Sequence, residues 1–243
     1  MKKDLRKQIK QDEVLTFFGK GWAFLAEHKD ETRVTLAVLA VVGILAGGLK
    51  YFQDSRSREA QAAFTDALSV YETPVAGEGP PQVGPTFPSE DEKYRKAAAA
   101  FEGVGRRFPT VAVGRRARYY AALSRIHLGE DDLAKQELTS LATDKEAGAL
   151  TSSLARVALA DLLKRKGKLE EAIAAYRELA SDGSLAVPRD YPQWNLATTL
   201  EDAGRLPEAA VAYRQLAEQF PASAFAADAR RMASYLSGDA RAS

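Results

Sequence analysis

Residues 167–180 read GKLEEAIAAYRELA, and residues 204–217 read GRLPEAAVAYRQLA. The second stretch begins 37 residues after the first, and nine positions of the two are identical. A weaker copy begins 38 residues upstream and contains Gly129, Ala134, Leu138, Leu141 and Ala142. Self-similarity at a period of roughly 20–50 residues is the sequence signature of stacked repeats. The chain is therefore predicted to form an all-α solenoid.

Each copy has the pattern of a helix, a tight turn and a second helix. Gly167 permits the turn, because glycine adopts a left-handed backbone conformation without steric cost. The small side chain of Ala172 lets the partner helix approach closely, and Tyr176 is expected to fill the gap between neighbouring pairs. The same roles are predicted for the counterparts Gly204, Ala209 and Tyr213.

The rest of the chain from residue 90 reads as helices with short breaks. Glycine and proline interrupt helices, and the predicted breaks lie at Pro109, Gly129, Gly167, Gly183, Gly204 and Pro221. Upstream, residues 53–71 read as a helix, and residues 72–89 hold five of the ten prolines and read as a loop. Ser89 with Glu92 three residues later predicts the start of the next helix.

A charge-free stretch, VTLAVLAVVGILAGGL, occupies residues 34–49. This run alone is short of a hydrocarbon core of about 30 Å, but residues 50–52 can lie at the interface. We therefore expect a transmembrane helix at 34–52. A cleaved signal peptide with its site at 46–48 is the sharper alternative, and a buried core helix is the other. The 33 preceding residues, six of them acidic, favour an uncleaved anchor.

Lysine and arginine are more frequent before this stretch than after it. There are eight in residues 1–33 and three in residues 50–82. By the positive-inside rule, we expect a single-pass protein of a bacterial inner membrane with its N-terminus in the cytoplasm and its repeats in the periplasm.

Two smaller features belong to the same region. Apolar residues at helical spacing in the tail predict an amphipathic helix that lies on inner-membrane lipid or packs on a partner protein. These residues are Val14, Phe18, Trp22 and Leu25. Gly43 and Gly47 form a G-x-x-x-G pattern, which lets two membrane helices approach closely. The pattern predicts a homodimer. The alternative is that it arises by chance in a span rich in Ala and Gly.

The predicted organisation has six parts in chain order. They are a cytoplasmic tail with an amphipathic helix at 1–33, a transmembrane helix at 34–52, a membrane-proximal helix at 53–71, a Pro/Gly-rich loop at 72–89, the repeat domain at 90–238 and a C-terminal tail at 239–243.

Composition argues against several functional classes. The chain has no Cys and only two His, His28 and His127, and its net charge is +1. Without cysteine there are no disulfides or thiolate metal ligands, and neither histidine has a second one nearby. The sequence contains neither a phosphate-binding loop nor a G-x-S-x-G motif. It also lacks the excess of basic residues that is typical of nucleic-acid-binding proteins. We therefore expect no enzymatic activity, cofactor, metal or nucleic-acid partner.

The pattern G-x-x-x-E-A-x-x-x-Y-x-x-L in the two best copies, closed by Pro221, resembles the tetratricopeptide repeat (TPR) family. The resemblance covers roughly residues 90–238, about three and a half repeats. It implies helix pairs stacked into a curved array that binds other proteins. Two departures matter. The period is 37 or 38 residues instead of about 34. The first helices also lack the family's usual Trp, Gly and Tyr, having Leu159, Ala160 and Leu163 in one repeat.

The layout of the whole chain is similar to the bacterial family of ancillary Sec-translocon subunits. The resembling stretches are Asp12-Glu13-Val14-x-x-Phe17-Phe18, the apolar run and the helix after it. The resemblance implies a tethered adaptor or chaperone-like protein near the Sec translocon, at the outer face of the inner membrane. The alternative is a structural subunit or assembly factor of a larger cell-envelope complex.

Candidate partner-binding residues follow from the repeat register. In a TPR array the first helices line the concave groove, and the turn glycines mark which positions face inward. The predicted groove residues are Arg116, Tyr119, Leu123, Val157, Asp161, Lys164, Tyr191, Trp194, Thr198 and Glu201. Tyr, Trp and Arg dominate binding hot spots. The alternative is that Tyr119 and Trp194 pack in the core between repeats.

Overall fold

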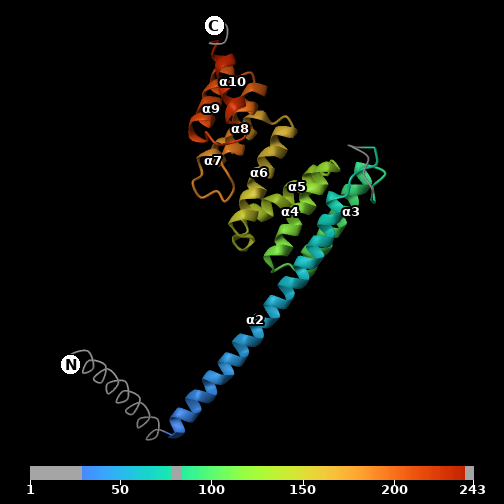
Figure 1. Cartoon of the computed structure of the whole chain (residues 1–243), viewed down its shortest axis with the longest axis vertical. Coiled ribbons are helices and arrows are strands. Elements are labelled where there is room, and N and C mark those ends of the chain that lie inside the picture. The colour runs from blue at the N-terminus through green and yellow to red at the C-terminus, as the bar shows by residue number, and fades with distance from the viewer. Residues whose placement is uncertain (1–28, 78–83, 239–243) are drawn as a thin grey trace, which may run out of the picture. The chain divides into compact units, whose positions relative to one another are not determined.

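The structure, a computed structural model, describes residues 29–77 and 84–238, and this part of the chain is all-α, as predicted. Figure 1 shows the helices in chain order. They are α2 (Lys29–Glu72), α3 (Glu90–Arg107), α4 (Ala112–His127), α5 (Asp131–Thr143), the 3-10 helix η1 (Lys145–Ala147), α6 (Ala149–Arg165), α7 (Leu169–Ser181), α8 (Asp190–Asp202), α9 (Leu206–Gln219) and α10 (Ala226–Ser237).

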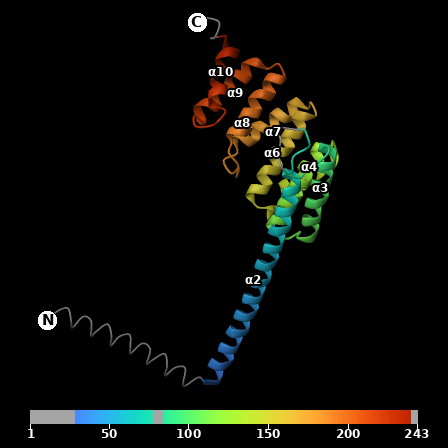
Figure 2. The ribbon, with the colours of Figure 1, turned by 45° about the vertical axis from the view of Figure 1, so that its right-hand side comes forward.

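Successive helices pack as pairs, α4 with α5, α6 with α7 and α8 with α9, and α10 packs on α9 (Figure 1, Figure 2). The turns within the pairs contain Gly129, Gly167 and Gly204, with φ of 75°, 70° and 73°. The amide after each glycine donates back to the preceding helix, as in Lys168 N to Leu163 O at 3.0 Å. This is the geometry that a left-handed glycine provides at a helix end, so the predicted turns are confirmed.

One apolar core runs through α6 to α10. Ala172 and Ala209 are both 0 % exposed, as expected for small residues at close helix contacts. Tyr176 and Tyr213 are among the largest fully buried side chains and belong to the same core. The roles predicted for the repeated alanine and tyrosine are confirmed.

The C-terminal part of α2 belongs to the packed array. The chain divides into two compact units, residues 1–55 and 56–243, and the boundary lies within α2. In the second unit, Ala60, Phe64 and Ala67 of α2 are buried in one core with Phe101 of α3 and Ala117 of α4. The array therefore extends upstream of residue 90, where the repeats were predicted to begin.

The described ends of the connection between α2 and α3 are held together by backbone hydrogen bonds. The amide of Ala76 donates to the Phe87 carbonyl at 2.8 Å, and the amide of Phe87 donates to the Pro74 carbonyl at 2.9 Å. The hydroxyl of Ser89 then accepts from the amide of Glu92 at 3.2 Å, which caps α3. The cap predicted from the sequence is confirmed.

The predicted membrane span is not found. Within residues 29–77 and 84–238, no helix combines the length and the apolar character that a bilayer crossing requires. This finding contradicts the span at 34–52 and the inner-membrane location inferred from it, with a cytoplasmic N-terminus and periplasmic repeats. The charge-free run measures about 24 Å at about 1.5 Å per residue, against a hydrocarbon core of about 30 Å. It continues within α2 into Lys50 and the charged residues of 54–59.

Two other predictions for the N-terminal region are not supported, and the remaining ones concern residues that the structure does not describe. The Sec-translocon resemblance depended on the membrane span and is not confirmed. Gly43 and Gly47 lie in α2 with open space beyond their Cα atoms, and a homodimer through them has no support. The amphipathic tail helix, His28 and residues 239–243 lie outside the described residues.

Replacing a buried alanine by a large side chain tests the repeat packing. We expect Ala172→Trp to lower the free energy of unfolding by roughly 2–3 kcal/mol, because the indole has no room at this contact. Ala209→Trp should act alike in the next repeat. Thermal melts should show a shift of roughly 5–10 °C. Ala174→Trp, at an exposed position of the same helix, is the control, and equal shifts for both α7 variants would refute the assigned register.

A second substitution tests whether α2 belongs to the array. Phe64 is 4 % exposed and contacts the rings of Phe101 and Tyr120 at centroid distances of 5.5 Å. Phe64→Ala should therefore destabilise the full chain by about 3–5 kcal/mol in a denaturant titration, because it opens a cavity in the core. Gln61→Ala, exposed on the same helix, should have little effect. Similar stability of both variants would show that α2 does not pack as described.

Candidate functional site

The ten predicted groove residues lie on the first helices of three successive pairs. We call them the first-helix face. Arg116, Tyr119 and Leu123 are on α4, Val157, Asp161 and Lys164 on α6, and Tyr191, Trp194, Thr198 and Glu201 on α8. Val157 is buried, Arg116 and Tyr191 are exposed, and the others are partly buried. Polar and aromatic side chains are thus accessible along these helices.

Hydrogen bonds join α6 and α8 across this face. The Tyr191 hydroxyl donates to Oδ2 of Asp161 at 3.2 Å. Nζ of Lys164 donates to Oγ1 of Thr198 at 2.7 Å and forms an ion pair with Asp202 at 3.3 Å. Four of the predicted residues are therefore brought together, although they are up to 37 residues apart in the sequence.

Asp161 is held from the core side by a residue outside the predicted set. The hydroxyl of buried Tyr176 donates to Oδ1 of Asp161 at 2.5 Å. Burial raises the pKa of Asp161, while the hydrogen bonds from Tyr176 and Tyr191 and the charge of Lys164 act in the opposite direction. Burial, followed by the charge of Asp161, raises the pKa of Tyr191 to about 12. The carboxylate thus couples the core of the α6–α7 pair to α8.

The next repeat contains a similar contact. The hydroxyl of Tyr213 donates to Oε2 of Glu201 on α8 at 2.9 Å. Burial and then this hydrogen bond raise the pKa of Tyr213. In both of the best repeats, the motif's tyrosine therefore bonds an acidic residue of the first helix. The sequence analysis predicted only that these tyrosines fill space in the core. Each of the two repeats has both the tyrosine and an acidic residue on its first helix, and this repetition is the signal that could have revealed the contact.

The side chain of Trp194 packs against two neighbouring aromatic rings. Its ring stacks on Phe225 at a centroid distance of 5.2 Å and an interplanar angle of 17°. It also meets the ring of Tyr213 edge-on at 5.3 Å. Trp194 is thus partly buried against the core of the last repeats. This packing favours the alternative that Trp194 contributes to stability.

On α4 the face adjoins aromatic residues of α2, a contact that the sequence analysis did not predict. The guanidinium of Arg116 lies 5.7 Å from the ring centroid of Phe64. Tyr120, next to Tyr119 in the chain, lies 5.8 Å from the ring of Tyr71 on α2. These contacts were missed because residues 53–71 were assigned to a membrane-proximal helix outside the repeat domain.

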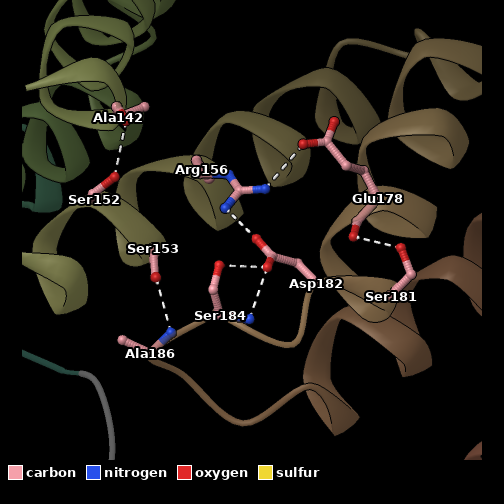
Figure 3. A network of polar contacts seen from close by, with 9 residues as sticks. All are labelled: Ala142, Ser152, Ser153, Arg156, Glu178, Ser181, Asp182, Ser184 and Ala186. Atoms are coloured by element: carbon pink, nitrogen blue, oxygen red, sulfur yellow. Dashed lines mark hydrogen bonds and ion pairs between the residues drawn. The ribbon is translucent and has the colours of Figure 1, made fainter.

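A polar network positions the connection between α7 and α8 (Figure 3). Nη1 of Arg156 on α6 donates to Oδ2 of Asp182 at 2.6 Å, and Oδ1 of Asp182 accepts from the Ser184 amide at 2.8 Å and its hydroxyl at 2.6 Å. The amide of Ala186 donates to the Ser153 hydroxyl at 3.0 Å. Hydrogen bonds from Ser184 and Arg156 lower the pKa of Asp182 to about 2. The network fixes the segment that leads into α8 and Tyr191.

Two other features that could hold a ligand have internal partners. A cavity of about 380 Å³ between α3, α4 and α5 contains Arg118 and Arg125, which pair with Glu137 and Glu102. His127 stacks on Tyr94 at a centroid distance of 3.9 Å, and burial lowers its pKa. In the described part of the chain, no three His, Asp or Glu side chains are grouped to bind a metal.

Comparison with known proteins gives a family match over most of the chain. The family described as "Tetratricopeptide repeat-like domain" matches residues 28–226, a range that includes the residues of α2. No curated protein and no solved structure matches the chain.

The packing of Trp194 leads to a stability prediction. Trp194→Ala should lower the free energy of unfolding by roughly 2–3 kcal/mol, less than a fully buried tryptophan would. Denaturant unfolding of the full chain measures this loss. Tyr235→Ala is a matched aromatic deletion at a position 59 % exposed on α10 and should change stability little. If Trp194→Ala is as stable as that control, Trp194 does not pack as described and acts mainly at the surface.

Proposed function

The chain belongs to the tetratricopeptide repeat-like family, and we propose that it is a protein-interaction adaptor that binds a segment of a partner on the first-helix face. TPR-like domains generally mediate contacts between proteins. The observation that carries the proposal is the row of polar and aromatic side chains on α4, α6 and α8, of which those on α6 and α8 are linked by hydrogen bonds. Within it, Tyr191 is 40 % exposed although its hydroxyl is held by Asp161.

This arrangement suits binding for two physical reasons. Tyrosine, tryptophan and arginine contribute most to binding hot spots, and Tyr191 and Arg116 are exposed on the face. Tyr191 is also held by its hydrogen bond before any partner arrives, which lowers the entropy cost of association. The proposed role is binding without catalysis.

A second candidate is a structural subunit or assembly factor of a larger protein complex. The observation behind it is the set of large apolar side chains on α2 in residues 1–55. Leu39, Ile44, Leu45 and Leu49 are between 60 % and 74 % exposed. Contiguous exposed apolar surface marks an interaction site, so this segment would pack permanently on another subunit.

Photo-crosslinking distinguishes the two candidates. A photoreactive amino acid would replace Tyr191 on the first-helix face, Leu45 on α2, or Val211, which is 48 % exposed on the second helix α9. The adaptor role predicts crosslinked protein partners from position 191 and none from position 211. A structural subunit predicts one fixed product from position 45 and none from position 191. Equal labelling from positions 191 and 211 would contradict the proposed binding face.

A further inference from the structure

Asp161 is a partly buried carboxylate that forms no ion pair with any cation in the described part of the chain. The nearest candidate in sequence is Lys164, one turn further along α6. Its ammonium group points instead to Thr198 and Asp202, at 2.7 and 3.3 Å. Removing a charge from water without a counter-charge is costly. A cation that reached Asp161 would relieve that cost.

The hydrogen bonds of Asp161 leave room for such a cation. Tyr176 bonds Oδ1 at 2.5 Å from the core side. The Tyr191 bond to Oδ2, at 3.2 Å, is longer than the 2.5–3.0 Å that is usual between a hydroxyl and an oxygen. A carboxylate has about four acceptor positions, so Oδ2 can accept from another donor. Tyr191 is 40 % exposed, which places this oxygen beside a solvent-accessible side chain.

The charges around Asp161 also favour a basic ligand. Glu201 accepts a hydrogen bond from Tyr213 and, among the described residues, forms no ion pair. The α6–α8 part of the face thus has the carboxylates of Asp161 and Glu201 against the ammonium of Lys164, which is already paired with Asp202 beside the face. An acidic segment would be repelled there, whereas a basic one is complementary. Burial raises the pKa of Asp161, and the charge of Lys164 only partly offsets that effect.

We propose that the first-helix face selects a basic segment of the partner, with a Lys or Arg side chain donating to Oδ2 of Asp161 beside Tyr191. This inference rests on the proposed adaptor function and adds the chemical class of the partner. The contact is charge-assisted, because both donor and acceptor are ionised. Asp161 then determines specificity, and the hydrogen bond from Tyr191 orients Oδ2.

Peptide selection on the full chain tests the inference. Ten-residue peptides are selected from a random display library, synthesised with a fluorescent label and titrated by fluorescence anisotropy. We expect the selected peptides to be enriched in Lys and Arg. Asp161→Asn should weaken their binding by about tenfold or more. Asp132→Asn removes the same charge from a side chain that is 96 % exposed on α5 and should change binding by less than about twofold.

A second variant keeps the test decisive if Asp161→Asn does not fold, which thermal melting will show. Lys164→Met leaves Asp161 intact and removes the neighbouring ammonium. It should tighten binding of the selected basic peptides by about threefold, because the local potential becomes more negative. Unchanged or weaker binding in that variant would overturn the inference.

The outcomes also separate this inference from the function on which it rests. Selected peptides that are neutral or acidic, or that bind Asp161→Asn as tightly as the original chain, overturn the basic-ligand inference. If Tyr191→Ala still abolishes their binding, the adaptor function stands. If no peptide is selected, or if Tyr191→Ala leaves binding unchanged, the adaptor function fails and the basic-ligand inference fails with it.

Discussion

The hydrogen bond from Tyr176 to Asp161 joins the packed interior of a helix pair to its charged face. A tyrosine ring that fills a core carries a hydroxyl that must find a partner. In the α6–α7 pair that partner is a carboxylate on the first helix, which is consequently held in place without a cation. Tyr213 and Glu201 repeat the arrangement in the next pair. The repeated tyrosine therefore supports the fold and also positions the acidic groups available for binding.

The geometry around this bond depends on small residues and tight turns. The left-handed conformation of Gly167 and Gly204 sets the two helices of each pair side by side, and the buried alanines let them approach. Turn chemistry, small residues at contacts and aromatic filling all favour the same stacked pairs, which is typical of a sequence that specifies one structure. The polar network of Arg156 and Asp182 then fixes where α8 begins relative to α6. A face held in this way can bind with little reorganisation.

The strongest repeats made most of this fold predictable, because a period of 37 residues locates the turns, the close contacts and the buried tyrosines together. Three features of the structure were not predicted from the sequence. The break at 144–148, where Asp144 caps η1 and Gly148 has a φ of 78°, falls after the weakest copy. The packing of α2 was obscured by the apolar run at 34–49, which suggested a different environment. The bond from Tyr176 to Asp161 spans fifteen positions in two helices, so helical periodicity does not reveal it. Of the site, the sequence located the first-helix positions but not the residue that holds Asp161.

A carboxyl NMR titration of the full chain tests the coupling between core and face most directly. The pKa of Asp161 is measured in the original chain and in Tyr176→Phe, which removes the hydroxyl and keeps the ring. A hydrogen bond to the ionised form lowers the pKa, so its loss should raise the pKa of Asp161 further. Tyr213→Phe, whose hydroxyl bonds Glu201 instead, should leave Asp161 unchanged. An unaltered pKa of Asp161 in Tyr176→Phe would contradict the account, because the buried tyrosine would then have no influence on the charge of the first-helix face.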